Sequence, residues 1–341
     1  MTDDIHKRKS EHITYSLSDE SLGTNRSGIE AYYFRHNALP EIDFDAIDLS
    51  TSLVGQSLSS PFLVSSMTGG AEMAESINRH LAIAAEQQGW ALALGSTRVI
   101  LEKEDFRSSF QLRSHAPSIP IIANLGAVQL NYGVTHADVE RIIDLTEANA
   151  LVLHLNSIQE IIQPGGDTNF AGLLEKIEAL VDALSVPVGV KEVGFGIDRD
   201  VARQLYDAGV SFIDIAGAGG TSWSQVEKLR SQEPIKKQAA EAFASWGNPT
   251  AKCLTDVRQA LPDHPLIASG GIRNGLDGAK AIALGADYVG FARKILKEAV
   301  ESPEHVIEWM KVKELELQMV MFGIGASHLD DLKTTDRIEK A

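Results

Sequence analysis

The chain has 341 residues, of which 44% are hydrophobic and 23% are charged, a composition typical of a folded globular protein with a sizeable core. The formal net charge of −16 argues against nucleic-acid binding, so an anionic ligand would depend on a local group of cations or on a metal ion. A single cysteine, Cys253, excludes an internal disulfide and suits a reducing cytoplasm. No apolar run is long enough to span a bilayer, so we expect no membrane partner.

The first 60 residues carry few signs of regular structure. The segment 6–12 (HKRKSEH) is the densest positive stretch of an acidic chain. Such runs are most often solvated tails, but here the alternative interpretation is a lid over an anion. Between Tyr32 and Ser60, Pro40 and Gly55 separate short extended pieces, which we interpret as a cap that precedes a barrel.

Eight apolar segments alternate with helical patterns along the rest of the chain. The helical periodicity is clearest over 72–88 and in the stripe that contains Leu173, Ile177 and Leu180. This alternation predicts a parallel (β/α)8 barrel. The expected strands cover residues 61–65, 91–94, 120–123, 151–155, 187–190, 212–215, 266–268 and 288–291.

We expect one structural domain built from three segments. Residues 1–60 would form a lid and cap, 61–300 the barrel, and 301–341 a closing helix and tail. Extra material between Trp223 and Trp246 is expected to form a helical excursion over the barrel mouth. Because external helices on a barrel often serve assembly, we expect a homo-oligomer, a tetramer or an octamer.

Nearly every expected strand ends in polar or glycine residues. In a (β/α)8 barrel these ends surround one mouth, because parallel strands end on the same face, and their convergence predicts an enzyme. Lys191 directly follows an apolar strand, where a partly buried ammonium needs an anionic partner. The other such groups are Ser66-Met67-Thr68, Ser96-Thr97-Arg98, Asn124, His154 with Asn156, Thr221, Gly271 to Arg273, and Arg293.

The last two expected strands open into GGIR and GFAR, which end at Arg273 and Arg293. A Gly-Gly turn alone is usually only a tight turn. On neighbouring parallel strands, however, the two segments would offer backbone N–H groups and two guanidinium groups to one phosphate. We therefore predict a phosphate site at this edge of the mouth.

The segment 154–160 (HLNSIQE) places an imidazole, two amides and a carboxylate within seven residues. A lone histidine at a strand end, such as His154, is more often structural than catalytic. Glu160 is better explained by function, because a carboxylate near a diphosphate would repel it unless Mg²⁺ joined the two. No cluster has the spacing of a zinc site.

The chain resembles the type 2 isopentenyl diphosphate isomerases, because it contains, in this order, RKSEH, SSMTGG, GSTR, ANLG, HLNSIQEIIQPGGD, VKEVGFG, AGAGGTSW, ASGGIRNG and GFAR. The match runs from Arg8 to the C-terminal segment. Members of this family are FMN-dependent barrels that interconvert isopentenyl and dimethylallyl diphosphate without net redox change. The resemblance implies reduced FMN and Mg²⁺ as cofactors, with NADPH as the reductant of the flavin.

The resemblance also implies the roles of individual residues. Substrate would be held by Arg8, Lys9, Ser96, Arg98 and Gln159, and Mg²⁺ by Glu160; the candidate catalytic residues are His154, Gln159 and Lys191. The expected FMN contacts are Ser66, Met67, Thr68, Ser96, Asn124, Lys191, Ala216, Thr221, Gly271, Ile272, Arg273, Ala292 and Arg293. Family members often have serine at the position of Ala216, so a backbone group would have to replace that hydroxyl contact.

A 1,3-proton shift needs a proton delivered to one carbon and removed from another. Reduced FMN could donate and recover this proton at N5, and Lys191 near the N1/O2 edge would favour the anionic flavin. One alternative is an FMN-dependent 2-hydroxy-acid oxidase or dehydrogenase, but such enzymes use a histidine after the sixth strand, where this chain reads AGAGGTSWSQVE. The other is a flavin-binding protein without turnover, which would leave HLNSIQE and RKSEH without a purpose.

Overall fold

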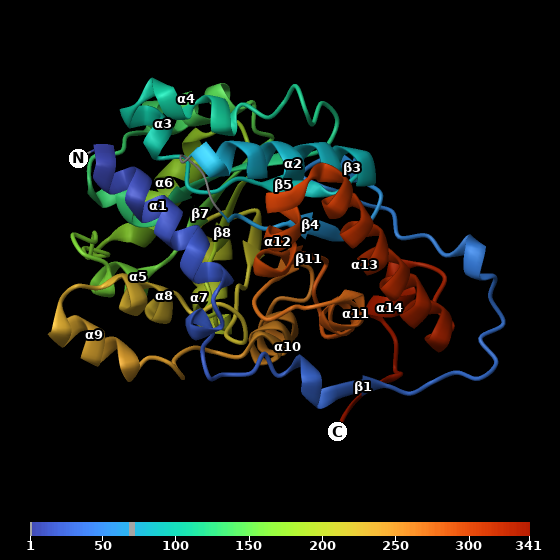
Figure 1. Cartoon of the computed structure of the whole chain (residues 1–341). Helices are drawn as coiled ribbons and strands as arrows, with labels where there is room; N and C mark the ends of the chain where they lie inside the picture. Colours follow the sequence, from blue (N-terminus) through green and yellow to red (C-terminus); the bar gives the residue numbers. More distant parts are fainter. Residues whose placement is uncertain (1, 68–71) are drawn as a thin grey trace.

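The computed structural model describes residues 2–67 and 72–341, in which eight parallel strands close into a barrel. Each strand pairs with its neighbour in sequence, and the last pairs with the first, Val289 opposite Phe62. The predicted (β/α)8 fold is therefore confirmed (Figure 1). The strands are β4 (Phe62–Val64), β5 (Ala91–Ala93), β6 (Ile121–Gly126), β7 (Ala150–His154), β8 (Val188–Lys191), β9 (Phe212–Asp214), β10 (Leu266–Ala268) and β11 (Tyr288–Phe291).

The predicted strand boundaries hold for β10 and β11 and are shifted at one or both ends elsewhere. The largest difference is at β6, which continues to Gly126 because its ladder with β7 extends to the pair Gly126 and His154. Asn124 therefore lies inside a strand rather than after it. Lys191 is likewise the last residue of β8, paired with Asp214, and not the first residue beyond the strand.

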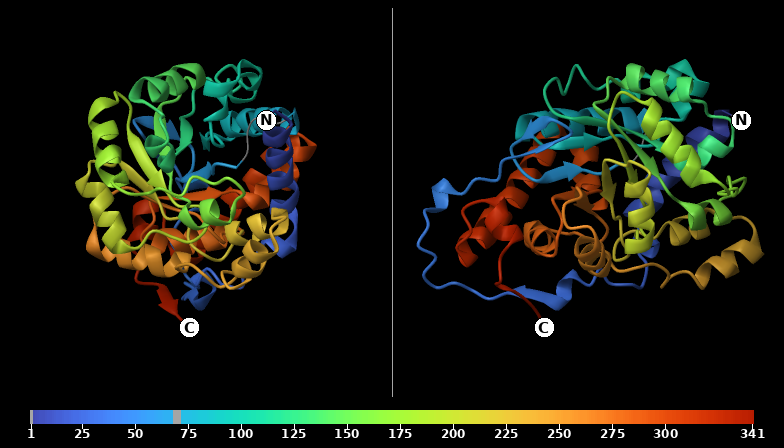
Figure 2. Two further views of the ribbon diagram at one scale, coloured as in Figure 1. Left: turned by 90° about the vertical axis from the view of Figure 1, so that its left-hand side faces the viewer. Right: turned by 180° about the vertical axis from the view of Figure 1, so that it is seen from behind.

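Helices surround the barrel on its outer side (Figure 2). Between the strands lie α2 (Glu72–Gln88), α3 (Val99–Glu102), α4 (His136–Thr146), α5 (Ser157–Ile162), α6 (Leu173–Ala183), α7 (Arg199–Asp207), α10 (Thr250–Ala260) and α11 (Gly275–Ala283). After β11 come α12 (Arg293–Glu301), α13 (Pro303–Ile324) and α14 (Leu329–Lys333). The turn after α11 uses Gly285, whose φ is 120°. Within the described residues no helix is both long and apolar enough to cross a membrane.

Two apolar layers hold these elements together. Inside the barrel, Ile122, Phe212 and Ile267 belong to a buried cluster contributed by the strands. Outside it, the helices pack on the other faces of the strands, where Trp90 stacks on Phe291 at a ring-centroid distance of 5.8 Å. This rigid core fixes the loops that follow the strands.

The first 60 residues include a helix that the sequence did not predict. The helix α1 (Thr2–Leu17) packs against α8 (Trp223–Arg230) and α12. It has few apolar side chains, so its sequence shows no apolar stripe of helical period. Farther on, β2 (Thr51–Leu53) pairs with β3 (Gln56–Leu58). A last strand, β12 (Ile338–Lys340), pairs antiparallel with β1 (Tyr32–Phe34). The expected helical excursion after the sixth strand forms α8 and α9 (Pro234–Glu241).

The barrel interior has no room for a side chain at Gly189. A Cβ atom there would lie 2.2 Å from the ring of Phe212. We expect Gly189→Ala to lower the free energy of unfolding by roughly 1–3 kcal/mol, because overpacking strains a dense core. Gly323→Ala is the control, since its Cβ would lie 3.8 Å from the nearest atom, in a helix that favours alanine. Equal urea-unfolding midpoints for the two variants would contradict this account.

Candidate active site

A cavity of about 1410 Å³ lies at the carboxyl ends of the barrel strands, with residues from the loops after all eight strands and from α1 in its wall. The predicted convergence of the strand ends is thus confirmed. Thr68 lies outside the described residues. All other predicted site residues line the cavity: Arg8, Lys9, Ser66, Met67, Ser96, Arg98, Asn124, His154, Gln159, Glu160, Lys191, Ala216, Thr221, Gly271, Ile272, Arg273, Ala292 and Arg293.

The turn after β10 requires glycine twice. Gly270 and Gly271 have φ values of 94° and 78°, and a Cβ on Gly270 would lie 2.0 Å from a backbone oxygen of Gly217. The two nearby guanidinium groups are partly paired. Arg273 Nε donates to Asp277 at 2.9 Å, and Arg293 Nη2 donates to Asp19 at 2.8 Å. Backbone N–H groups and cations at this edge fit a phosphate group.

The end of β4 offers two unused hydroxyl groups. Ser65 Oγ and Ser66 Oγ are buried and have no hydrogen-bond partner among the described residues. Buried hydroxyls without partners indicate a missing polar ligand. Ala216, across the mouth, has a φ of 40°, which is unusual for a residue other than glycine. Together with the glycine turn, these features fit an FMN molecule.

Lys191 is buried beside two carboxyl groups. Its Nζ donates to the Glu192 carbonyl oxygen at 2.5 Å. Burial raises the pKa of Glu192 to about 7, although backbone N–H groups and Lys191 oppose this shift. Burial also raises the pKa of Asp214, against the attraction of Lys191 and a 2.6 Å hydrogen bond from Ser269. Lys191 interacts with both carboxyl groups through its charge, without a direct ion pair among the described residues.

His154 is held as a neutral imidazole. Burial, and then the charge of Lys191, lower its pKa to about 3. Its Nδ1 lies 2.9 Å from Asn124 Oδ1, so this nitrogen carries the proton and donates it to the amide oxygen. At neutral pH His154 can therefore orient a ligand or accept a hydrogen bond, and it holds no extra proton to deliver. Its catalytic role stays a prediction.

Glu160 has the surroundings of a magnesium ligand. Its carboxylate accepts hydrogen bonds from Asn156 Nδ2 at 2.8 Å and from the Asp167 N–H at 2.8 Å, and burial raises its pKa. Asn156 Oδ1 is buried without a partner among the described residues, which leaves a neutral oxygen beside the carboxylate. The described residues contain no group of three or more metal-ligand side chains. This donor set fits Mg²⁺, which usually takes few protein ligands and completes its shell with water and phosphate.

The cations on the α1 side of the mouth differ in their pairing. Arg98 pairs with Glu102 at 3.0 Å and with Asp167 at 3.1 Å. Lys9 Nζ is buried without a hydrogen-bond partner among the described residues, 5.5 Å from the centre of the Phe110 ring. Burial, and then the nearby Arg8, lower the pKa of Lys9 to about 7. An anion bound here would supply the partner that Lys9 lacks.

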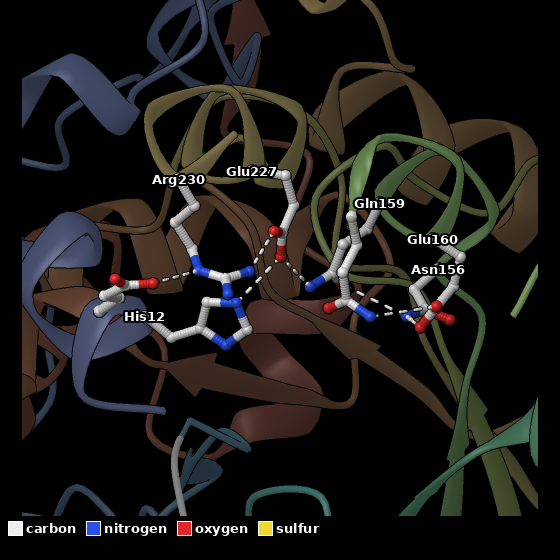
Figure 3. Close-up of polar contacts among 8 residues, drawn as sticks. His12, Asn156, Gln159, Glu160, Glu227 and Arg230 are labelled. Carbon is white, nitrogen blue, oxygen red and sulfur yellow. Dashed lines mark hydrogen bonds and ion pairs between the residues drawn. The ribbon is translucent and has the colours of Figure 1, made fainter. Parts of the chain in front are cut away.

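No motif in the sequence predicted a role for Glu227, which lies on α8 and contacts Gln159 (Figure 3). Its buried carboxylate accepts hydrogen bonds from Gln159 Nε2 at 3.1 Å and from His12 Nε2 at 2.9 Å, and it pairs with Arg230. Burial alone would raise the pKa of Glu227, but these partners bring it below its usual value. The local sequence SWSQVEK does not predict these contacts, because the partners His12 and Gln159 lie far from Glu227 in sequence.

Comparison with known proteins places the chain among flavin enzymes. The FMN-dependent dehydrogenase family model matches residues 4–113 and 155–339. The isopentenyl-diphosphate delta-isomerase of Oceanobacillus iheyensis is 59% identical over 339 residues, which cover 99% of this chain and 97% of the relative. The protein of the same name from Synechococcus sp. is 51% identical over 320 residues, covering 93% and 92%.

A solved flavocytochrome b2 with sulfite bound has the same fold, with a TM-score of 0.68 over 96% of this chain and 82% of that one, at 16% identity. This similarity concerns the fold alone. The curated relatives confirm the resemblance noted in the sequence. The chain belongs to the FMN-dependent, type 2 isopentenyl-diphosphate delta-isomerase family.

Proposed function

We propose that the protein interconverts isopentenyl and dimethylallyl diphosphate by a 1,3-proton shift, with reduced FMN and Mg²⁺ bound. The observation that carries this proposal is the presence of two separate groups of anion-binding residues around one mouth. The glycine turn and Arg293 follow β10 and β11, whereas Arg98 follows β5, two strands from β11, and Glu160 follows β7, which lies opposite β11 in the ring of strands. Such a cavity has separate places for a flavin phosphate and a substrate diphosphate.

In this proposal, different residues bind the diphosphate, Mg²⁺ and the flavin. Arg8, Lys9 and Arg98 would hold the diphosphate, and Glu160 with the open oxygen of Asn156 would hold Mg²⁺ against it. When bound, reduced FMN supplies an acid–base group at N5. Lys191 places a buried positive charge in the cavity wall, which favours an anionic cofactor.

Proton movement in the chain itself would involve Gln159 and the carboxylate behind it. The Gln159 amide lines the cavity, and its orientation is fixed by donation to Glu227. Glu227 is ionised, so a proton gained at Gln159 Oε1 can be matched by loss of an Nε2 proton to Glu227, which leaves Gln159 in its imidic acid form. The neutral His154 would orient the ligand.

Other features of the proposal rest on the sequence and, for NADPH, on the family resemblance. NADPH would reduce the flavin, the protein would work in the cytoplasm, and the chain would assemble as a homo-oligomer. Residues 1–60 would act as lid and cap, 61–300 as the FMN-binding barrel and 301–341 as the closing segment. The 2-hydroxy-acid oxidase alternative is weaker, because the loop after β9 leads through Thr221 to Trp223 and offers no histidine.

The first test uses Glu160→Gln, which keeps the size of the side chain but removes its charge. In D₂O with dithionite-reduced FMN and Mg²⁺, the wild-type protein should convert isopentenyl diphosphate and incorporate solvent deuterium into the product. The variant should lose about 100-fold or more of kcat/KM, because the metal loses its carboxylate. The exposed Glu241→Gln is the control.

Isomerase activity that is unchanged both by Glu160→Gln and by removal of Mg²⁺ would contradict the metal assignment. An active enzyme without deuterium incorporation would contradict the proton shift. FMN titration, followed by the flavin absorbance, should give the same affinity for the variant and the wild-type protein, which separates metal loss from cofactor loss.

The pKa of Lys9 predicts a pH dependence. Its pKa of about 7 means that the ammonium is present below this pH and is lost as the pH rises through it. Because kcat/KM reports groups of the free enzyme, its value for isopentenyl diphosphate should fall above pH 7. Lys9→Arg keeps the charge and should remove this fall, whereas Lys9→Met should lower kcat/KM below pH 7 and approach the wild-type value above it. Identical profiles for wild type and Lys9→Arg would exclude Lys9 as the cause.

A further inference from the structure

The helix α1 carries substrate-binding candidates but has little apolar anchorage on the barrel. Arg8 and Lys9 line the cavity, and among the described side chains of α1 only Ile13 is a buried hydrophobic residue. Glu11 and His12 follow Arg8 at positions i+3 and i+4, so the three side chains share one face of the helix. Whatever holds Glu11 and His12 therefore also sets where Arg8 lies.

Both side chains are held by α8. Arg230, in the last turn of that helix, donates through Nε to Glu11 Oε2 at 3.1 Å and pairs through Nη1 with Glu227 Oε2. His12 donates to the other oxygen of Glu227 at 2.9 Å, and its ring meets Trp223 edge-to-face at a centroid distance of 5.1 Å. Figure 3 shows Arg230 and His12 on one side of the Glu227 carboxylate and Gln159 on the other.

Because this network is buried, its contacts are energetically important. The Arg230 side chain is 8% exposed and that of Glu227 is fully buried, while Glu11 is 29% exposed. Exposed ion pairs contribute little, but a buried charge that loses its partner is strongly destabilised. The guanidinium of Arg230 is thus committed to this place between the two carboxylates.

The same carboxylate also fixes Gln159, through the hydrogen bond from its amide. One end of the network therefore determines the position of Arg8 and Lys9, and the other end fixes the Gln159 amide in the cavity wall. When binding of a remote part of the substrate also helps to position the reacting groups, its binding energy can serve catalysis.

We infer that Arg230 is a positioning residue that holds α1 over the mouth through Glu11, so that Arg8 and Lys9 meet the diphosphate while Gln159 is kept in place through Glu227. The part that concerns the diphosphate rests on the proposed function. The attachment of α1 does not, because it follows from the contacts alone.

The test compares three variants of the FMN-loaded protein. Glu11→Gln removes the charge on α1 but keeps the pair between Arg230 and Glu227 intact. Arg230→Gln removes both contacts. Lys228→Met is the matched control on α8, since Lys228 pairs with Glu241, whose side chain is 68% exposed, and neither residue lines the cavity. Two quantities are measured: amide hydrogen exchange of residues 8–17 without substrate, and KM and kcat for isopentenyl diphosphate.

Glu11→Gln should speed exchange in residues 8–17 and raise KM about 5- to 50-fold, with kcat within about twofold of the wild-type value, because only the placement of the cations is weakened. Arg230→Gln should raise KM at least as much and also lower kcat, because Gln159 loses its support. Lys228→Met should match the wild-type protein in both measurements.

Unchanged exchange of residues 8–17 in both Glu11→Gln and Arg230→Gln would overturn the inference, whatever reaction the protein catalyses. Faster exchange with an unchanged KM would also overturn it, because α1 would then be attached without positioning the cations. If the wild-type protein shows no isomerase activity, the proposed function fails, while the exchange measurement still decides whether Arg230 holds α1.

Discussion

The constraint behind the architecture of the mouth is electrostatic: a chain with a net charge of −16 surrounds a site built for anions. The sign of the charge has to be reversed locally, and the barrel does this by bringing distant cations to one rim. Without ligands these cations would repel one another. Asp19, Asp167 and Asp277 neutralise part of the charge by pairing with the arginines after the strands. Lys9 Nζ has no hydrogen-bond partner among the described residues. Burial lowers the pKa of Lys9 to about 7, so part of its population is uncharged at neutral pH.

Three acids, Glu192, Asp214 and Glu227, are buried, and each is satisfied in a different way. Glu192 accepts hydrogen bonds from a series of backbone N–H groups, and Asp214 is held by Ser269 and Lys191. Glu227 depends on side chains from three different segments. Fully satisfied polar networks of this kind fix geometry more specifically than apolar packing does. The active-site side chains are thus positioned by hydrogen bonds on top of a barrel that apolar packing makes rigid.

Local sequence patterns were sufficient for the barrel and for the residues around its mouth. The apolar runs and glycine turns of β10 and β11 could be located because strand periodicity and turn chemistry are local properties. Glu227 could not be found this way, since its partners His12 and Gln159 lie 215 and 68 positions away. The helix α1 was not predicted for a related reason. Polar contacts with α8 hold it in place, so its sequence has no hydrophobic stripe of helical period. Most individual roles came from the family resemblance, because residue spacing seldom shows which ligand a strand end contacts; the phosphate site at Arg273 and Arg293 was predicted from the glycine turns alone.

The pairing of β1 with β12 has a consequence for the order of assembly. Tyr33 Oη donates to Glu339 Oε2 at 2.6 Å across 306 positions of sequence, so β1 has no partner until the whole barrel has been synthesised. Chains emerge from the ribosome with the N-terminal part first, and contacts between distant residues form late. The segment that carries β1 is therefore among the last to settle. Its pairing with β12 joins the chain before the barrel to the chain after it, and this link forms only once the barrel between them is complete.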